Sequence, residues 1–432
     1  MRYRWRDFPS MLATAAGRSQ IGEGVRYRMW PVSSRLARAY RRTVVRGTHV
    51  VAVVGSSGKS TTVRAIAAAL GIVPSDTQLH NAWGSISRAM LGIVRGQPNA
   101  VVEVGIADKG QMERYSRVVL PDVAVVTSIG SEHHRSLGTL DVTRDEKAWM
   151  VRALPAGGSV VLNADDANVM WMRGETRARV VTFGIDAECD VRATDVRIDW
   201  PRGTRFRIVA FGQERDAEIR LLGRHMVRAA LAAVAVAHLE GVSVDDALAR
   251  LAGLAPTPGR LQAVELSNGA TLLRDDYKAP VETIDAALDV LEEIPARRRI
   301  VVLGEISEPP NPQHATYRRI AERVGRIATH FFVAGRMMKD YRPGAHSAGM
   351  PHANIVPAGE TPRETAAKLE ALLEPGDVVL VKGRDTQRLA RICLVLQGRT
   401  VRCDIRSCHL RAVTCDACPM LERGWGSHRV VM

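Results

Sequence analysis

The stretch VVAVVGSSGKSTTVRAIAAAL, from Val50 to Leu70, decides the fold class of this chain. It opens with a continuous run of β-branched residues, the composition of a buried parallel strand. After a glycine-containing turn, apolar residues recur at helical spacing, at Val63, Ile66, Ala67 and Leu70. The stretch therefore predicts a buried strand, a tight turn and a helix.

The turn itself has the composition of a phosphate-binding loop. Gly55 and Gly58 allow a tight backbone turn that exposes N–H groups, and the helix that follows directs its positive end toward an anion. Lys59 is placed to reach the β and γ phosphates, and Ser60 to bind magnesium. The spacing GxxGK[ST] is shorter than the usual GxxxxGK[ST], so the position between a strand and a helix supports the interpretation. The predicted nucleotide-binding residues here are Gly55, Ser56, Ser57, Gly58, Lys59, Ser60 and Thr61.

The same alternation of strands and helices continues along the chain. HVVAVVG, NAVVEVG, PDVAVVTSIG and GSVVLNADD are apolar runs typical of parallel strands, and the rhythm restarts beyond PTPGRLQ, residues 256–262. The predicted fold class is α/β: a P-loop-type, mostly parallel central sheet with helices on both faces, followed by a smaller Rossmann-like α/β domain. We expect a basic N-terminal segment at 1–48, the ATP-binding domain at 49–260, the second domain at 261–398 and a Cys-rich tail at 399–432.

Charge is distributed unevenly along the chain. The 432 residues carry a net charge of +14, much of it in the arginine-rich first 46 residues, which also contain Tyr27, Trp30, Leu36 and Tyr40. Such a segment suits an amphipathic helix at a membrane interface, or equally a solvated or partner-covered helix. No run of about 18 apolar residues is present, so we expect a cytoplasmic protein, either free or at the inner face of the membrane. No nucleic-acid-binding module is recognised, so we expect no nucleic-acid partner.

Many short motifs, in order, resemble one family. They are GSSGKSTT, HNAWG, EVGIADKGQM, TSIGSEHHRSLGTL, DEKAWM, VVLNADD, GRH, PTPGRLQ, DDYKAP, VVLGE and LVKGR, which together span about Val50 to Arg384. The chain is similar to the Mur ligases, ATP-dependent enzymes that join amino acids to peptidoglycan precursors. EVGIADKGQM and the VVLGE to LVKGR region most resemble the branch that adds D-alanyl-D-alanine to a muramoyl tripeptide.

The resemblance implies an acid–amino-acid ligase that uses ATP and Mg²⁺ and acts through an acyl phosphate on a cell-wall-type carboxylate acceptor. The family's catalytic positions fall on Lys59, Glu103, His133, Lys147 and Arg260. Glu103 and His133, with Ser60, match magnesium ligands, and Lys147 matches a lysine that carries a metal-binding carbamate. Arg260 follows a glycine, and a guanidinium suits the γ phosphate.

Other family positions match less closely. Asp276 and Lys278 correspond to residues near the nucleotide ribose and phosphates. Asn81, with Thr127 and Ser128, corresponds to the acceptor side, where the acceptor is a small molecule or a lipid-linked one. The incoming amino acid or dipeptide is expected near a basic pair, Lys382 and Arg384, for which a plain basic loop is the alternative.

Several departures leave other functions open. The family's GRHNxxNALAA has Met226 and Ala229 in place of the two asparagines, an acidic residue is replaced by Trp149, and the loop at DDYKAP is one residue shorter. Fewer than 50 residues precede the ATP site, so no N-terminal UDP-binding domain is expected. The alternatives are a nucleotide-binding scaffold or regulator without turnover, or a ligase for a lipid-linked or poly-glutamate acceptor.

The tail CDIRSCHLRAVTCDACPM contains four cysteines: Cys403, Cys408, Cys415 and Cys418. Four thiolates suit a structural zinc site, and CxxC is a common half of one. The first pair has an unusual gap. Zinc and free thiols in a loosely ordered tail therefore both stay open.

Overall fold

A computed structural model describes residues 8–73, 81–131, 134–410 and 413–425. The chain divides into two compact units: Arg26–Ala255, and Met1–Val25 together with Pro256–Met432. The second unit thus resumes at Pro256, a few residues before the predicted boundary at 261. Among the described residues, no helix has both the length and the apolar character needed to cross a membrane.

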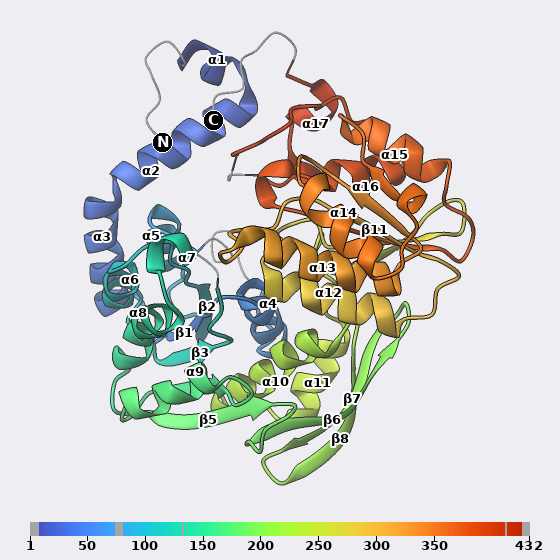
Figure 1. Cartoon of the computed structure of the whole chain (residues 1–432). Coiled ribbons are helices and arrows are strands. Elements are labelled where there is room, and N and C mark those ends of the chain that lie inside the picture. Colours follow the sequence, from blue (N-terminus) through green and yellow to red (C-terminus); the bar gives the residue numbers. More distant parts are fainter. Residues whose placement is uncertain (1–7, 74–80, 132–133, 411–412, 426–432) are drawn as a thin grey trace. The chain divides into compact units, whose positions relative to one another are not determined.

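The unit formed by Arg26–Ala255 contains an eight-stranded sheet in the order β2-β1-β3-β4-β5-β6-β7-β8 (Figure 1). The strands are β1 (His49–Val54), β2 (Asn99–Glu103), β3 (Val123–Val126), β4 (Ser159–Asn163), β5 (Arg179–Gly184), β6 (Val191–Asp199), β7 (Gly203–Ala210) and β8 (Gln213–Ile219). Neighbours from β2 through β6 run parallel, whereas β6, β7 and β8 form an antiparallel meander. The four parallel strands predicted from apolar runs are β1 to β4.

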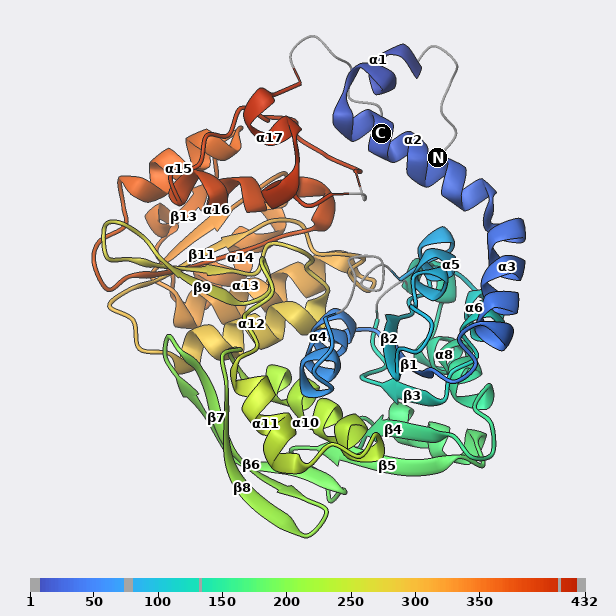
Figure 2. The same cartoon turned by 180° about the vertical axis from the view of Figure 1, so that it is seen from behind.

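Helices cover both faces of this sheet. Alternate strand residues such as Val50 and Ala52 pack with Ile86, Tyr115 and Met150, which come from helices on one face. The helices α4 and α10 contact each other and the sheet on the opposite face (Figure 2). The helices of this unit are α3 (Trp30–Thr43), α4 (Lys59–Ala69), α5 (Gly84–Leu91), α6 (Gln111–Val119), α7 (His134–Leu137), α8 (Leu140–Arg152), α9 (Ala167–Trp171), α10 (Arg224–Leu239) and α11 (Val244–Ala252).

The meander β6 to β8 was not among the predicted strands. In β7, GTRFRIVA, exposed arginines alternate with buried Phe206 and Ile208, the pattern of a strand with one face in water. The prediction looked for continuous apolar runs, which mark strands buried on both faces. A search for alternation would have found this meander.

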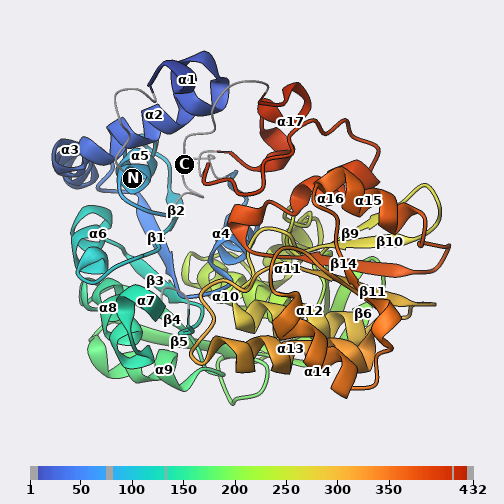
Figure 3. The same cartoon turned by 45° about the horizontal axis from the view of Figure 1, so that its top comes forward.

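The second unit has a six-stranded sheet in the order β13-β12-β11-β14-β10-β9. Figure 3 labels four neighbours of this sheet, β11, β14, β10 and β9. Its strands are β9 (Gln262–Glu265), β10 (Thr271–Arg274), β11 (Arg299–Leu303), β12 (His330–Val333), β13 (Ile355–Pro357) and β14 (Val378–Lys382). All pairs are parallel except β9 with β10. The helices are α1 (Phe8–Ala13), α12 (Val281–Glu293), α13 (Gln313–Ile327), α14 (Met338–Ser347), α15 (Pro362–Glu370), α16 (Ala390–Leu396) and α17 (Met420–Arg423); α2 (Ala15–Arg28) begins in this unit. The predicted fold class is confirmed: two α/β units with mostly parallel sheets.

The N-terminal segment is divided between the two units. Residues 26–48 belong to the first unit, whereas Ala16 of α2 packs with Cys403, Cys408 and Leu410 in the second. The cysteine-rich tail is thereby part of a small apolar cluster that also contains Met420 and Trp425. The predicted boundaries made 1–48 and 399–432 separate segments. In the structure, both segments are packed into the two units.

Candidate active site

The phosphate-loop sequence forms the predicted turn between a strand and a helix. β1 ends at Val54 and α4 begins at Lys59. Gly58 precedes α4 with φ at +79°, a conformation that side chains disfavour. Gly55 has φ at +149°, and a Cβ there would lie 2.0 Å from Thr127 Oγ1. Both glycines are therefore required by backbone conformation, and Gly55 by a close approach as well.

The loop that follows β3 holds the phosphate loop in shape. Ser56 N donates to Ser128 O at 2.8 Å, and Ser57 N donates to Ser128 Oγ at 3.0 Å. Thr127 Oγ1 donates to Ser57 O at 2.6 Å. Thr127 and Ser128 thus brace the phosphate loop in this structure, and their place on the acceptor side stays a prediction. These hydrogen bonds with Thr127 and Ser128 fix the direction of the backbone N–H groups of the phosphate loop.

Two buried lysines converge on one carbonyl of the loop. Lys59 Nζ donates to Gly55 O at 2.8 Å and to Ser56 O at 3.0 Å. Lys147 Nζ, from α8, donates to the same Gly55 O at 2.9 Å, and its residue is 1% exposed. The two amino groups concentrate positive charge at the start of a helix, which favours binding of an anion.

A buried carboxylate lies at the same sheet edge. Glu103 ends β2, and its Cα partner in the register with β1 is Val53, two residues before Gly55. Asn81 Nδ2 donates to Glu103 Oε1 at 2.7 Å. Glu103 is 2% exposed, and its second oxygen, Oε2, has no hydrogen-bond partner among the described residues. A buried carboxylate oxygen left over in this way is costly unless it binds a cation, so Glu103 fits the predicted metal ligand.

The rest of the predicted magnesium set is incompletely described. Ser60 lies in the first turn of α4, and His133 lies outside the described residues. Within the described part of the chain, no group of three or more His, Cys, Asp and Glu side chains is arranged to hold a metal ion. One carboxylate therefore supports the magnesium prediction, and the complete ligand set stays a prediction.

The departure at Trp149 lies away from the lysine it was expected to affect. Trp149 follows Lys147 by two positions on α8, so their side chains point to different sides of the helix. It is 37% exposed, and the Arg152 guanidinium lies 5.3 Å from its ring centre. Trp149 therefore does not face Lys147.

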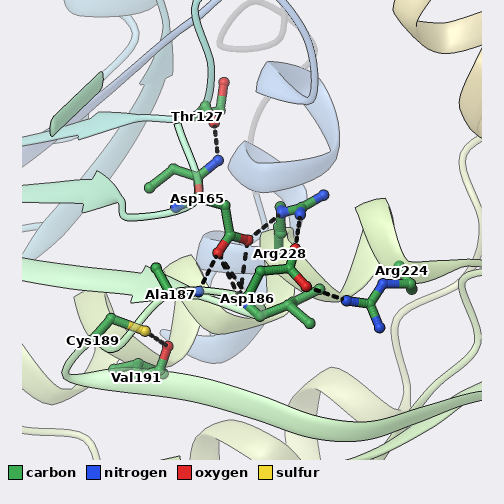
Figure 4. Close-up of polar contacts among 10 residues, drawn as sticks. Thr127, Asp165, Asp186, Ala187, Cys189, Val191, Arg224 and Arg228 are labelled. Carbon is green, nitrogen blue, oxygen red and sulfur yellow. Dashed lines mark hydrogen bonds and ion pairs between the residues drawn. The ribbon is translucent and has the colours of Figure 1, made fainter. Parts of the chain in front are cut away.

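The departures on α10 are buried. Met226 and Ala229 are 8% and 5% exposed, so neither presents a hydrogen-bonding group at the surface. Arg228, between them, donates through Nε to Asp165 Oδ2 at 2.8 Å and through Nη2 to Asp186 Oδ2 at 3.2 Å (Figure 4). On the exposed side of α10, Arg228 therefore forms ion pairs with the loops that follow β4 and β5.

Asp165 is the centre of that network. Its carboxylate accepts hydrogen bonds from the backbone N–H groups of Ile185, Asp186 and Ala187, at 2.9 to 3.1 Å. Burial by itself raises the pKa of Asp165, but these N–H groups and Arg228 outweigh it and hold the pKa below its ordinary value. The sequence prediction missed this residue, although the NADD motif after β4 marked its position.

In the second unit, Arg260, predicted to bind the γ phosphate, lies against an aromatic ring. The guanidinium carbon of Arg260 is 4.6 Å from the ring centre of Tyr277, a cation–π contact. The next residue, Leu261, donates its N–H to Asp275 Oδ1 at 3.2 Å. Arg260 and the DDYKAP loop are thus held together locally, and the predicted contact of Arg260 with the γ phosphate stays a prediction.

Asp276 is engaged by a buried arginine. Arg274 donates through Nε to Asp276 Oδ2 at 3.0 Å and through Nη1 and Nη2 to Asp416 at 2.8 and 3.1 Å. Arg274 is 3% exposed and Asp276 5% exposed. Burial raises the pKa of Asp276 above its ordinary value, although Arg274 opposes the shift. In this conformation Asp276 supports the loop and does not present its carboxylate to a ribose.

Lys382 is also structural in this conformation, contrary to the prediction that it meets the incoming amine. Its ammonium donates to Asp275 and to Lys278 O, the latter at 2.9 Å, and the residue is 1% exposed. Burial lowers the pKa of Lys382, while Asp275 opposes the shift. Arg384 remains accessible, with Nη1 3.9 Å from Glu305 Oε2. The basic pair therefore separates into a buried anchor and an accessible arginine.

The cysteine-rich tail does not form a metal site in the described residues. Cys403 and Cys408 are buried in the cluster with Ala16, and Cys418 packs against it. Burial raises the pKa of Cys415 to about 12 and also raises that of Cys418, which keeps both as neutral thiols. A cavity of about 30 Å³ beside Cys415 and Asp416 has room for roughly one water molecule. In this structure the cysteines of the tail pack in an apolar cluster, and Asp416 accepts hydrogen bonds from Arg274.

A phosphate loop at the edge of a mostly parallel sheet, followed by a second parallel α/β unit, defines a nucleotide-dependent α/β enzyme. Residues 53–237 match the Mur ligase middle domain, and residues 259–384 match the Mur ligase glutamate ligase domain. The chain belongs to the Mur ligase family, whose members are ATP-dependent peptide ligases of peptidoglycan synthesis.

The relatives agree with this assignment. The chain is 29% identical over 416 residues to UDP-N-acetylmuramoyl-tripeptide–D-alanyl-D-alanine ligase of Mycobacterium tuberculosis, covering 89% of this chain and 79% of the relative. The enzyme of that name from Bacillus subtilis is 26% identical over 374 residues, covering 83% and 77%. The structure of MurF from Acinetobacter baumannii shares the fold, with a TM-score of 0.76 at 22% identity, covering 86% of this chain and 81% of that one. MurF from Thermotoga maritima, in complex with ADP, has a TM-score of 0.74 at 22% identity, covering 85% and 83%.

Proposed function

We propose that this ligase joins the amine of an amino acid or dipeptide to the terminal carboxylate of a cell-wall peptide through an acyl phosphate. The observation that carries the proposal is the convergence at one sheet edge of the braced phosphate loop, Lys59, Lys147 and the buried carboxylate of Glu103. Cations and loop N–H groups suit a polyphosphate, and a buried carboxylate beside them suits a metal-bound nucleotide.

The proposed reaction has two steps. An oxygen of the acceptor carboxylate attacks the γ phosphorus of ATP, the bond from that phosphorus to the β–γ bridging oxygen breaks, and ADP leaves. The amine nitrogen then attacks the acyl carbon, an amide forms, and inorganic phosphate and a proton are released. In both steps the loop N–H groups and Lys59 hold phosphate oxygens in place and offset their charge.

Magnesium is the cofactor that these residues fit. Glu103, together with Ser60 and His133, would hold it, and when bound it neutralises phosphate charge. Carbamylation of Lys147 stays a prediction, as does the contact of Arg260 and Lys278 with the phosphates. In the structure, the amino group of Lys147 donates to Gly55 O.

The substrates are proposed from the chemistry that the relatives' names state. Those names specify a UDP-linked muramoyl tripeptide and D-alanyl-D-alanine, so we propose a muramoyl peptide as acceptor and a D-alanyl dipeptide as amine. Asn81, which contacts Glu103, is proposed on the acceptor side, and Arg384 on the amine side. Since ATP is a cytoplasmic substrate, the reaction takes place in the cytoplasm.

Phosphate release tests the proposal. Purified protein with ATP and magnesium is supplied with UDP-linked or lipid-linked muramoyl peptide, and with D-alanyl-D-alanine or single amino acids. Release that needs both substrates, and that Lys59→Ala abolishes, supports the ligase. ATP binding without release for every pair would overturn it and would favour the second candidate, a nucleotide-binding regulator. The buried Met226 and Ala229, which offer no hydrogen bond, are the observation that favours this alternative.

Structural zinc in the tail stays a separate prediction that the described geometry does not support. Metal analysis of protein purified under reducing conditions decides it. One zinc per chain, lost when Cys415 and Cys418 are replaced by serine, would establish the site. A zinc-free, folded protein would remove it.

A further inference from the structure

The helix α3 (Trp30–Thr43) has one face anchored to its own unit. Trp30 contacts Trp83 and Tyr115 edge to face, with ring centres 5.6 and 5.4 Å apart. Tyr40 donates through its hydroxyl to Ile93 O at 2.8 Å. Arg41 also anchors the helix. It is 6% exposed and donates hydrogen bonds to Leu120 O and to Asp122 Oδ2, the latter at 2.6 Å. α3 lies beside α5 and α6 in Figures 1 and 2, where these contacts hold it.

The opposite face of α3 is apolar and exposed. Val32 and Leu36 are 57% and 58% exposed and lie one turn apart, on the side of the helix that is turned away from Trp30 and Arg41. Just before α3, Tyr27 and Met29 are 57% and 49% exposed, and just after it Val44 is 41% exposed. Five of the fourteen large apolar residues exposed in the described chain thus lie within residues 27–44. Such a concentration marks an interaction surface, because exposed apolar residues are normally scattered.

The charge on this face is of one sign. Residues 26–46 contain seven arginines and no Asp or Glu. Arg28, Arg35, Arg42 and Arg46 are exposed, and Arg35 and Arg42 lie two turns apart on one side of α3, about a third of a turn around the helix from Leu36. At the end of the helix, Arg46 also lines an open groove of about 580 Å³ that runs between residues 43–48 and 95–98. The surface formed by residues 27–46 therefore combines exposed apolar side chains with a continuous positive charge.

We propose that the surface of residues 27–46 docks the protein on an anionic lipid bilayer. Val32 and Leu36 would enter the boundary between head groups and acyl chains, while the arginines bind lipid phosphates. Long arginine side chains suit this position because their stems lie in apolar surroundings with the charge in the head-group layer. Charge complementarity favours an anionic surface, and the apolar side chains favour lipid over nucleic acid, whose backbone offers them nothing to bury against.

The docked helix is joined to the candidate site by aromatic contacts. Tyr27 lies edge to face with Trp83 at 5.4 Å between ring centres, and Trp83 is two residues after Asn81, the partner of Glu103. A bilayer at α3 therefore lies near the proposed acceptor side. This consequence rests on the proposed function and favours a lipid-linked acceptor, whereas docking itself does not depend on catalysis.

Co-sedimentation of the full chain with vesicles tests the docking without ATP or substrates, so its outcome is independent of ligase activity. The vesicles are phosphatidylcholine alone, or equal parts phosphatidylcholine and phosphatidylglycerol. The test variants are Val32→Ser with Leu36→Ser, and Arg35→Gln with Arg42→Gln. The matched controls are exposed residues of the same unit: Val73→Ser with Val209→Ser, and Arg177→Gln with Arg179→Gln.

We expect binding to the anionic vesicles only. Replacing the arginine pair should lower the affinity for anionic vesicles about fivefold per charge removed. Replacing Val32 and Leu36 should lower it roughly tenfold or more. Both control pairs should bind like the parent, and all four variants should unfold at the parent temperature, since these side chains are exposed.

Three outcomes would overturn the proposal. The first is that the parent protein does not bind anionic vesicles. The second is that binding depends on the arginines but not on Val32 and Leu36, which indicates a general polyanion site. The third is that the parent is a dimer that Val32→Ser with Leu36→Ser dissociates, which makes this surface an interface between copies of the chain.

Discussion

Replacing Glu103 with glutamine should separate a functional carboxylate from a structural one. The substitution keeps the shape of the side chain. It also keeps an oxygen that can accept the hydrogen bond from Asn81 Nδ2, which is 2.7 Å long in the parent protein. What it removes is the negative charge on the buried oxygen without a partner in the described chain. If that charge binds a cation, its loss should weaken nucleotide binding and turnover far more than it lowers the free energy of unfolding.

The expected magnitudes follow from this difference. With metal chelated, the free energy of unfolding should change by no more than about 1 kcal/mol, because packing and the Asn81 hydrogen bond are kept. Ligand at a hundred times its Kd stabilises a protein by about 2.7 kcal/mol. For a unit of this size that is an increase in Tm of roughly 5–10 °C. Magnesium and ATP together should produce this increase in the parent, and Glu103→Gln should lose most of it. Turnover should fall about a hundredfold or more, equivalent to roughly 3 kcal/mol.

The assay is thermal unfolding with EDTA and with magnesium plus ATP, followed by phosphate release with both substrates. Glu146→Gln is a matched control, because one Glu146 oxygen accepts from Gly110 N at 2.8 Å and the other has no partner among the described residues. It should keep both the Tm increase and the turnover. The reasoning fails if Glu103→Gln behaves like this control, or if it loses about 3 kcal/mol of stability with metal chelated.

Three further predictions concern residues that hold the two units in shape. Gly55→Ala should cost at least about 2 kcal/mol and abolish ATP binding, because its φ is +149° and the new Cβ would overlap Thr127; an unchanged Tm would contradict this. Asp165→Asn should cost about 1–3 kcal/mol at neutral pH. The folded-state pKa of Asp165 is depressed, so its contribution is present above the ordinary pKa of 3.8 and is lost as the pH falls through the lower folded value. Urea unfolding at several pH values should therefore show parent and variant converging in acid, and a constant difference would contradict the assignment. Asp416→Ala should destabilise the second unit by about 2 kcal/mol, because it removes the two-pronged partner of buried Arg274; urea unfolding equal to the parent's would show that the tail is not anchored there.

Elements set by local composition were predicted correctly. The predicted strands β1 to β4 are continuous apolar runs, and such runs have few alternatives to a strand buried on both faces. The phosphate loop is local as well, since its glycines, lysine and serine are adjacent in sequence. Helix ends are local in the same way: Ser243 caps α11 by accepting a hydrogen bond from Asp246 N, and Gly241 follows the end of α10 with a positive φ.

Contacts between distant segments were decided by the tertiary structure. Lys382 was assigned to substrate because it is basic and ends a strand, but Asp275, more than a hundred residues away, holds it in the interior. Lys147 converges with Lys59 on Gly55 O only because α8 packs beside the loop. Sequence patterns carry no information on such pairings, since the free energy of a buried charge depends on partners that folding alone brings near.

The sequence by itself therefore determined the parallel strands β1 to β4, the phosphate loop and the family of this protein, because each depends on neighbouring residues or on motifs in a fixed order. The tertiary structure decided which charged residues are anchors and which remain available for chemistry. It also gave α3 its two faces, because the outward position of Val32 and Leu36 follows from the contacts that Trp30 and Arg41 make on the other side of the helix.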